Sequence, residues 1–183
     1  MVTIRIPDFS LVVLVGASGS GKSTFARKHF LPTEVVSSDV CRALVADDEN
    51  ALDASDDAFA LLHTIAATRL KRHRLTVIDA TNVLTESRKV LVRLAGDWDC
   101  PLVAIVLDLP ERICEERNAV RAERQLSGHI VRRHVRDLRR SLPRLDREGF
   151  RHVVVLRTAE EVEGATVERV KLWDLLAGTS TRC

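Results

Sequence analysis

The sequence lacks the features that mark several classes of protein. It has no C-x-x-C pair and no histidine at zinc-like spacing, because its cysteines are scattered at Cys41, Cys100, Cys114 and Cys183. Neither a disulfide framework nor a zinc finger is predicted, and reduced cysteines favour a cytoplasmic location. The apolar run Leu11–Val15 is far shorter than the ~20 residues that cross a bilayer, and no signal peptide precedes it. We therefore expect no membrane partner.

Aromatic residues are also few, with five Phe, two Trp and no Tyr. The remaining composition is ordinary: 183 residues, 45% hydrophobic and 30% charged. These values predict one globular domain, which we expect over residues 1–175. The last eight residues, LAGTSTRC at 176–183, are expected to be a flexible tail or the cut end of a domain from a longer protein.

Charge is spread unevenly along the chain, although the formal net charge is only +2. Residues 39–57 hold seven acidic residues and one arginine, a net charge of −6. Residues 112–147 hold eleven arginines and five acidic residues, a net charge of +6. The basic block is either an anion-binding surface or the solvated face of helices.

Short apolar runs alternate with helical patterns along the chain. This alternation predicts an α/β fold with a parallel sheet of four to five strands, flanked by helices on both faces. Loops at the carboxyl ends of the strands would then form a crevice. The expected strands are Leu11–Val15, Val35–Val36, Leu75–Ile78, Leu102–Leu107 and Val153–Leu156, and the expected helices are Lys22–His29, Asp39–Ala46, Asp56–His73, Thr85–Ala95 and a long arginine-rich region, Glu111–Leu142.

The strongest motif is GASGSGKST at residues 16–24, which fits G-x-x-x-x-G-K-[ST] between an expected strand and an expected helix. Its glycines would let successive N–H groups surround a phosphate at the helix N-terminus. Lys22 would bridge the β- and γ-phosphates of ATP or another nucleoside triphosphate, and Ser23 would ligate Mg²⁺ or Mn²⁺. The alternative is a chance Gly/Ser loop. The candidate nucleotide-binding residues are Gly16, Ala17, Ser18, Gly19, Ser20, Gly21, Lys22, Ser23 and Thr24.

A second motif, LTVIDATNV, carries an aspartate to the end of a buried strand. Asp79 could reach Mg²⁺ through water as a Walker B carboxylate, or it could cap the following turn. Thr81 and Asn82 are turn formers or ligands. The guanine-reading motif N-K-x-D is absent, which argues against a GTPase.

Asp39 and Arg42 follow the expected strand Val35–Val36, which we expect beside the strand that enters the glycine-rich loop. Phosphoryl transfer needs a carboxylate that accepts the proton of the attacking hydroxyl, and Asp39 is the candidate base. Arg42, one helical turn on, could hold an anionic group of the acceptor. The alternative is a helix cap and a solvent-exposed ion pair.

Three arginines share one face of the segment PERICEERNAVRAERQ. At 100° per residue, Arg117, Arg121 and Arg124 lie within an arc of about 60°. They indicate a helical lid over residues 110–128 that supplies positive charge to the migrating phosphoryl group. Pairing with Glu116 and Glu123 is the alternative.

The segment after the lid shows a helical core stripe. Its arginines must then point outward, where they could bind a polyanion. The stripe is Val131, Val135, Leu138 and Leu142, and the outward residues are Arg132, Arg133, Arg136, Arg139 and Arg140. The histidines have no partner pattern and are expected at the surface: His63, His73, His129, His134 and His152.

In their order, these motifs resemble the 5′-kinase domain of bacterial polynucleotide kinase-phosphatase, the end-healing component of an RNA repair system. The resemblance covers nearly the whole chain, through GASGSGKSTFARKHF, PTEVVSSDVCRALVADDEN, LTVIDATNV, ERNAVRAERQ and REGF. It implies an adenylate-kinase-like P-loop fold and transfer of the ATP γ-phosphate to the 5′-hydroxyl of RNA or DNA. It also implies linked phosphatase and ligase-like modules, which this chain does not contain.

The resemblance assigns roles to residues of this sequence. It implies that Lys22 and Ser23 act on the phosphates and the metal, Asp39 is the base and Arg42 contacts the phosphate of the acceptor. Arg117, Arg121 and Arg124 match the lid arginines of the family. Two other functions remain open from the residues: a small-metabolite kinase of the shikimate or gluconate type, and a nucleotide-gated binding module without turnover.

Overall fold

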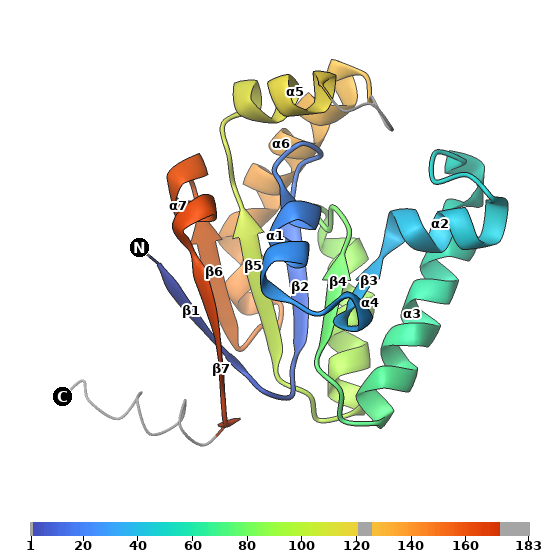
Figure 1. Ribbon diagram of the computed structural model, residues 1–183, viewed down its shortest axis with the longest axis vertical. Coiled ribbons are helices and arrows are strands. Elements are labelled where there is room, and N and C mark those ends of the chain that lie inside the picture. The colour runs from blue at the N-terminus through green and yellow to red at the C-terminus, as the bar shows by residue number, and fades with distance from the viewer. Residues whose placement is uncertain (1, 121–125, 173–183) are drawn as a thin grey trace.

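A five-stranded parallel sheet forms the centre of the molecule, in a computed structural model that describes residues 2–120 and 126–172 (Figure 1). The strand order is β3-β4-β2-β5-β6. The strands are β2 (Leu11–Gly16), β3 (Val35–Ser37), β4 (Thr76–Asp79), β5 (Leu102–Leu107) and β6 (His152–Leu156). The predicted α/β class and number of strands are confirmed.

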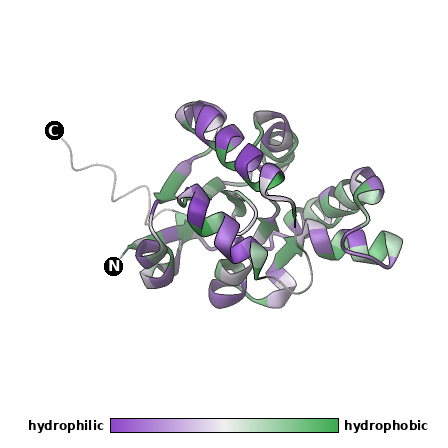
Figure 2. Ribbon diagram, turned by 90° about the horizontal axis from the view of Figure 1, so that it is seen from above, coloured by the Kyte–Doolittle hydropathy of each residue, from purple (hydrophilic) through white to green (hydrophobic). Residues whose placement is uncertain are grey.

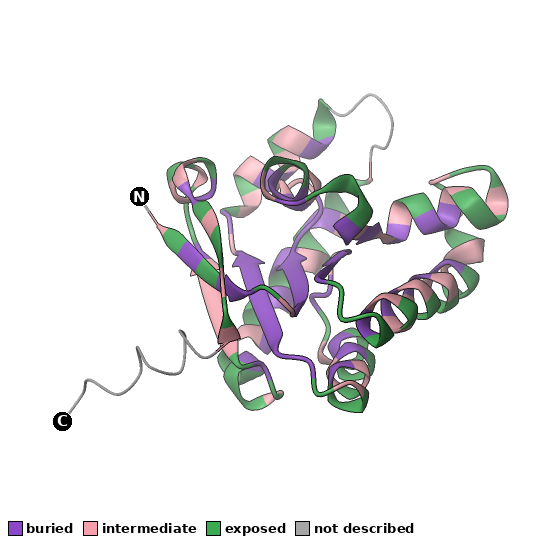
Figure 3. Cartoon of the chain, turned by 60° about the horizontal axis from the view of Figure 1, so that its bottom comes forward, coloured by how far each residue is buried: buried purple, intermediate pink, exposed green. Residues whose placement is uncertain are grey.

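Helices cover both faces of this sheet, because each strand is apolar on both sides. One face packs against α3 (Ser55–Lys71) and α4 (Thr85–Asp97). The other packs against α1 (Lys22–His29) and α7 (Ala159–Gly164). Figure 3 shows buried strands between helices that are buried on one side only, and Figure 2 shows hydrophilic residues along the outer helices.

A second, two-stranded parallel sheet was not predicted. It joins β1 (Thr3–Pro7) to β7 (Thr166–Val170), with Ile4 paired to Val167. Both strands are short and carry charged residues between their apolar ones, so they show no continuous apolar run. Glu34 on the short 3₁₀ helix Pro32–Glu34 fixes this sheet to the body through two hydrogen bonds, of 2.8 and 2.6 Å, from the Arg169 guanidinium.

The strand order corrects one expectation. β3 does not lie beside β2, because β4 is inserted between them. Ser37 nevertheless pairs with Asp79, and Asp79 pairs with Leu14, so the three strands end at one edge of the sheet. That edge therefore carries the glycine-rich loop, Asp79 and the start of α2 (Ser38–Ala46) together.

The described part of the arginine-rich region contains two α-helices. They are α5 (Glu111–Ala119) and α6 (Gly128–Ser141), followed by the 3₁₀ helix Leu142–Arg147. On α6 the predicted core stripe is confirmed at Val131, Val135 and Leu138, and the five arginines of this helix are exposed. Among residues 2–120 and 126–172, no helix has the length and apolarity required to span a membrane.

Candidate active site

The glycine-rich loop connects the end of β2 to the start of α1, as its motif predicts. Gly19 and Gly21 adopt positive φ angles of 81° and 96°, a region that L side chains rarely enter. A Cβ atom on Gly19 would also strike the carbonyl oxygen of Cys114 on α5. The first turn of α1 contains no acidic residue and no side-chain cap, so no side chain of this turn competes with an anion for its N–H groups.

Lys22 is buried beneath this loop. Its ammonium group donates hydrogen bonds to the carbonyl oxygens of Gly16 at 2.9 Å and Ala17 at 2.8 Å. These bonds fold the Lys22 side chain back against the loop, so that the ammonium charge lies next to the space that the loop encloses. The local fold thus concentrates a cation and several N–H donors at one point.

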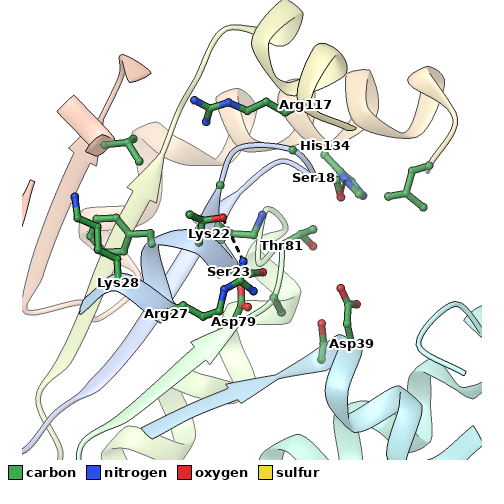
Figure 4. Close-up of a pocket in the computed structure, with 18 of the residues that line it drawn as sticks. Ser18, Lys22, Ser23, Arg27, Lys28, Asp39, Asp79, Thr81, Arg117 and His134 are labelled. Carbon is green, nitrogen blue, oxygen red and sulfur yellow. Dashed lines mark hydrogen bonds between the residues drawn. The ribbon is translucent and has the colours of Figure 1, made fainter. Parts of the chain in front are cut away.

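A cavity of about 710 Å³ opens beside the loop. Its volume lies in the range of small-molecule sites. The cavity is lined by residues of α1 and α7 and by residues near the start of α2: Thr24, Phe25, Lys28, Val162, Glu163, Ser38, Asp39, Arg42, Phe59 and Thr81. In Figure 4, Lys28 and Asp39 lie on opposite sides of the cavity, with Lys22 and Ser23 between them.

Asp79 lies at the bottom of the cavity, beside Ser23. Burial raises the pKa of this carboxyl, and the Lys22 ammonium and a hydrogen bond from the Ser23 side chain act in the opposite direction. Within the described ranges no group of three His, Cys, Asp or Glu side chains could hold a metal ion. A hydroxyl and one carboxylate match the way Mg²⁺ is bound, through one or two protein ligands together with phosphates. Ser23 and Asp79 therefore fit the metal role.

The turn after β4 supports the loop from below. Asn82 adopts a positive φ of 48°, and its side-chain amide donates to the carbonyl of Leu14 at 2.8 Å. The Gly16 N–H donates to the Thr81 carbonyl at 2.9 Å. Of the two roles weighed for Asn82, the turn is what its conformation favours. Thr81 faces the cavity.

A buried arginine holds this turn in place. Arg88 of α4 is fully buried and donates to the Asn82 carbonyl at 2.7 Å. Its guanidinium also forms two hydrogen bonds of 2.7 Å to the Glu148 carboxylate. The sequence did not identify this pair, although Arg88 falls on the buried stripe of α4 with Leu91 and Ala95.

Asp39 and Arg42 form an ion pair of 2.8 Å at the cavity wall. The exposed fraction of the Arg42 side chain is 5% and that of Asp39 is 29%. Arg42 Nη1 also donates to the Glu49 carbonyl at 2.8 Å, while its buried Nε has no hydrogen-bond partner. The pairing alternative is thus correct in part, but the pair lines the cavity and is not a solvent-exposed surface pair.

The helix α5 places Arg117 above the loop. Its Nη1 atom lies 3.4 Å from the position that a Cβ atom on Gly21 would take. Arg117 pairs with Glu163 of α7 at 3.6 Å, so its partner is not the Glu116 considered from the sequence. Arg121 and Arg124, the other two predicted lid arginines, lie outside the described residues, as does the predicted tail at 176–183.

The expectation that the histidines lie at the surface was wrong for His63, His134 and His152, which are half-buried. His134 of α6 is half-buried and lines the cavity, where its Nδ1 lies 3.3 Å from Ser18 Oγ (Figure 4). No motif predicted this contact, because the two residues are 116 positions apart. Phe59, Arg27 and Lys28 are further cavity residues that the sequence did not identify.

Comparisons with known proteins agree with this geometry. The chain is 27% identical over 153 residues to the bifunctional polynucleotide phosphatase/kinase of Schizosaccharomyces pombe, a match that covers 82% of this chain and 31% of that protein. The chain thus spans about a third of the length of the curated relative it matches.

Solved structures share the fold. A chain of the Pnkp1/Rnl/Hen1 RNA repair complex matches with a TM-score of 0.67 and 27% identity, over 77% of this chain and 47% of that chain. A gluconokinase from Sinorhizobium meliloti 1021 matches with a TM-score of 0.54 and 17% identity, over 87% of this chain and 88% of that chain. At 17% identity, the match to the gluconokinase shows a shared fold alone.

The model of the AAA domain family matches residues 11–145. This range contains the glycine-rich loop, Asp39, Asp79, Arg88 and the α5–α6 pair. With its loop, buried lysine and parallel sheet in place, the chain belongs to the AAA domain family.

Proposed function

We propose that this protein is a polynucleotide 5′-hydroxyl kinase, which transfers the γ-phosphate of ATP to the 5′-OH end of RNA or DNA in nucleic acid end repair. The observation that carries the proposal is the position of the Asp39–Arg42 pair in the wall of the cavity that also contains Lys22, Ser23 and Asp79. An acid that can accept a proton thus shares one space with a phosphate-binding loop.

Relatives support the same chemistry. The Schizosaccharomyces pombe protein combines phosphatase and kinase in its name, and the matching solved structure is an RNA repair complex, each at 27% identity. By analogy we infer that the chain acts on a nucleic acid and operates with linked phosphatase and ligase-like domains. We also infer a cytoplasmic location, supported by Cys41, Cys100 and Cys114, which are buried free thiols.

The residues divide the work as follows. The loop N–H groups and Lys22 bind the phosphates of the donor, and Ser23 and Asp79 would hold Mg²⁺. Asp39 orients the 5′-hydroxyl and takes its proton as the bond to phosphorus forms. The ion pair with Arg42 fixes the direction of that carboxylate, and the buried guanidinium places positive charge where a phosphate of the acceptor would lie.

Arg117 supplies positive charge from above the loop, and we infer the same role for Arg121 and Arg124. In the bound state, ATP supplies the phosphoryl group and Mg²⁺ neutralises charge on its phosphates. Lys28 lies on the side of the cavity away from Asp39 (Figure 4), and we infer that the nucleoside of the donor binds on that side. On that side the Lys28 ammonium donates to the Glu163 carbonyl at 2.5 Å, which joins α1 to α7.

The proposal is tested by incubating the protein with γ-labelled ATP, Mg²⁺ and a single-stranded oligonucleotide that ends in 5′-OH. We expect label at the 5′ end, and no label on the same oligonucleotide carrying a 5′-phosphate. A parallel reaction with gluconate and shikimate as acceptors tests the alternative that the protein is a small-metabolite kinase, whose fold the gluconokinase shares. Label on those acceptors alone, or no transfer to any acceptor, would refute the polynucleotide assignment.

A further inference from the structure

The α5–α6 pair touches the glycine-rich loop at three successive places. Gly19 packs against the carbonyl of Cys114, and Gly21 lies beside the guanidinium of Arg117. The third contact joins two side chains, Ser18 Oγ and His134 Nδ1, at 3.3 Å. The loop is therefore held from above as well as from the sheet below.

Packing fixes the position of His134. Its neighbours Val131, Val135 and Leu138 on α6 are 0–2% exposed and belong to the core. The imidazole projects from the flank of this buried stripe toward the cavity. A side chain carried by a well-packed helix can hold a loop in one shape at low entropic cost.

The contact lies at one particular end of the loop. In the cavity, Ser18 and His134 are on the side toward Asp39 and away from Lys28 (Figure 4). The phosphate that is transferred must point toward the acceptor, because attack occurs in line with the bond that breaks. Ser18 thus borders the part of the loop that the terminal phosphate would occupy.

We propose that His134 is a positioning residue for the terminal phosphate of the donor, acting through Ser18. The hydrogen bond between the two side chains holds the upstream half of the loop in the shape that presents its N–H groups to that phosphate. This proposal rests on the proposed transfer from a nucleoside triphosphate. It concerns the terminal phosphate alone, whereas the downstream half of the loop binds the inner phosphates and Lys22 reaches both the β- and the γ-phosphate.

Nucleotide binding separates this role from simple packing. We would measure the affinity for ADP and for the β,γ-imido analogue of ATP by calorimetry, in the wild type, His134→Ala, Ser18→Ala and the double variant. His134→Ala should bind the ATP analogue about three- to tenfold more weakly, the loss expected for one hydrogen bond, and should bind ADP as the wild type does. His134→Gln, which can bond to the same hydroxyl, should recover most of the affinity.

The double variant provides the sharper criterion. If the two side chains act as one unit, the double variant should lose no more affinity than either single variant. His129→Ala is the matched control, since His129 is an exposed histidine of the same helix outside the cavity. Equal losses for ADP and the ATP analogue, additive losses in the double variant, or unchanged binding in His134→Ala would each overturn the proposal.

The outcome does not depend on the acceptor. Binding of ADP and the ATP analogue is measured without turnover, so the test retains its meaning even if no oligonucleotide is labelled. If His134→Ala does not fold, Ser18→Ala and His134→Gln carry the comparison from each side of the same contact. Conversely, transfer to a 5′-OH oligonucleotide with no effect at His134 would leave the proposed function intact and remove this residue from it.

Discussion

Replacement of Arg88 by methionine should destabilise the protein severely. The side chain is fully buried, and its guanidinium donates to the Glu148 carboxylate twice at 2.7 Å and to the Asn82 carbonyl at 2.7 Å. Weaker contacts of 3.3 Å reach the hydroxyls of Ser141 and Thr85. Methionine fills much of the same volume but leaves Glu148, which is 10% exposed, without its cation.

Loss of one partner from a buried ion pair costs about 3–5 kcal/mol. For a domain of this size each kcal/mol lowers the melting temperature by roughly 2–4 °C, so the expected fall is roughly 6–20 °C. Thermal and urea denaturation would measure it. ATP binding should weaken as well, because Asn82 holds β2 through its bond to the Leu14 carbonyl.

The double variant Arg88→Met/Glu148→Leu tests the physical reason. An apolar pair leaves no buried charge without a partner, so the double variant should regain at least half of the lost stability. Lys89→Met, which removes the exposed cationic partner of Glu86 on the same helix, is the control and should change stability by less than about 1 kcal/mol. A single variant within about 1 kcal/mol of the wild type, or a double variant as unstable as the single one, would refute the reasoning.

Three further predictions concern the cavity. Asp79→Asn should raise the melting temperature and lower Mg²⁺-dependent transfer. Burial holds the pKa of Asp79 above its usual value. The stability linked to this group is therefore present at low pH and is lost as the pH rises through the pKa of the folded state. Melts across pH would check this, and a variant less stable than the wild type at neutral pH would contradict it. Gly19→Ala should abolish nucleotide binding, because φ is 81° and the new Cβ would strike the Cys114 carbonyl. The control Gly96→Ala should not reduce binding, because a Cβ there would have nothing within 4 Å. Equal affinities of the two variants in calorimetry would count against the loop geometry. Phe59→Leu should raise KM for a 5′-OH oligonucleotide by about fivefold or more through lost base stacking, and should leave KM unchanged for an oligonucleotide with an abasic 5′ end; equal changes in steady-state kinetics would exclude stacking.

Much of the fold follows from short-range patterns. The five strands of the main sheet were predicted because each is an apolar run flanked by polar residues or glycine, which a parallel strand buried on both faces requires. The glycine-rich loop was predicted because its residues are contiguous. β1 and β7 escaped because they alternate with charged residues and pair across 163 positions, as Thr3 with Thr166.

The parts of the site that were missed depend on distant partners. A buried arginine on an apolar stripe signals that a carboxylate lies nearby, but only the fold shows that Arg88 meets Glu148. The contact of His134 with Ser18 depends in the same way on how α6 packs over the loop. Strand order was misjudged because neighbours in sequence usually pair, while here β4 separates β3 from β2.

The central claim is that Asp39 accepts the proton of a hydroxyl aligned with the phosphate held by the loop. Its most direct test is single-turnover transfer to a 5′-OH oligonucleotide by Asp39→Asn, with ATP affinity measured alongside and Asp57→Asn, an exposed carboxylate outside the cavity, as control. The account predicts nearly unchanged ATP affinity and a transfer rate lower by more than about 10²-fold. Equal losses of affinity and rate, or a rate like that of the wild type, would contradict it.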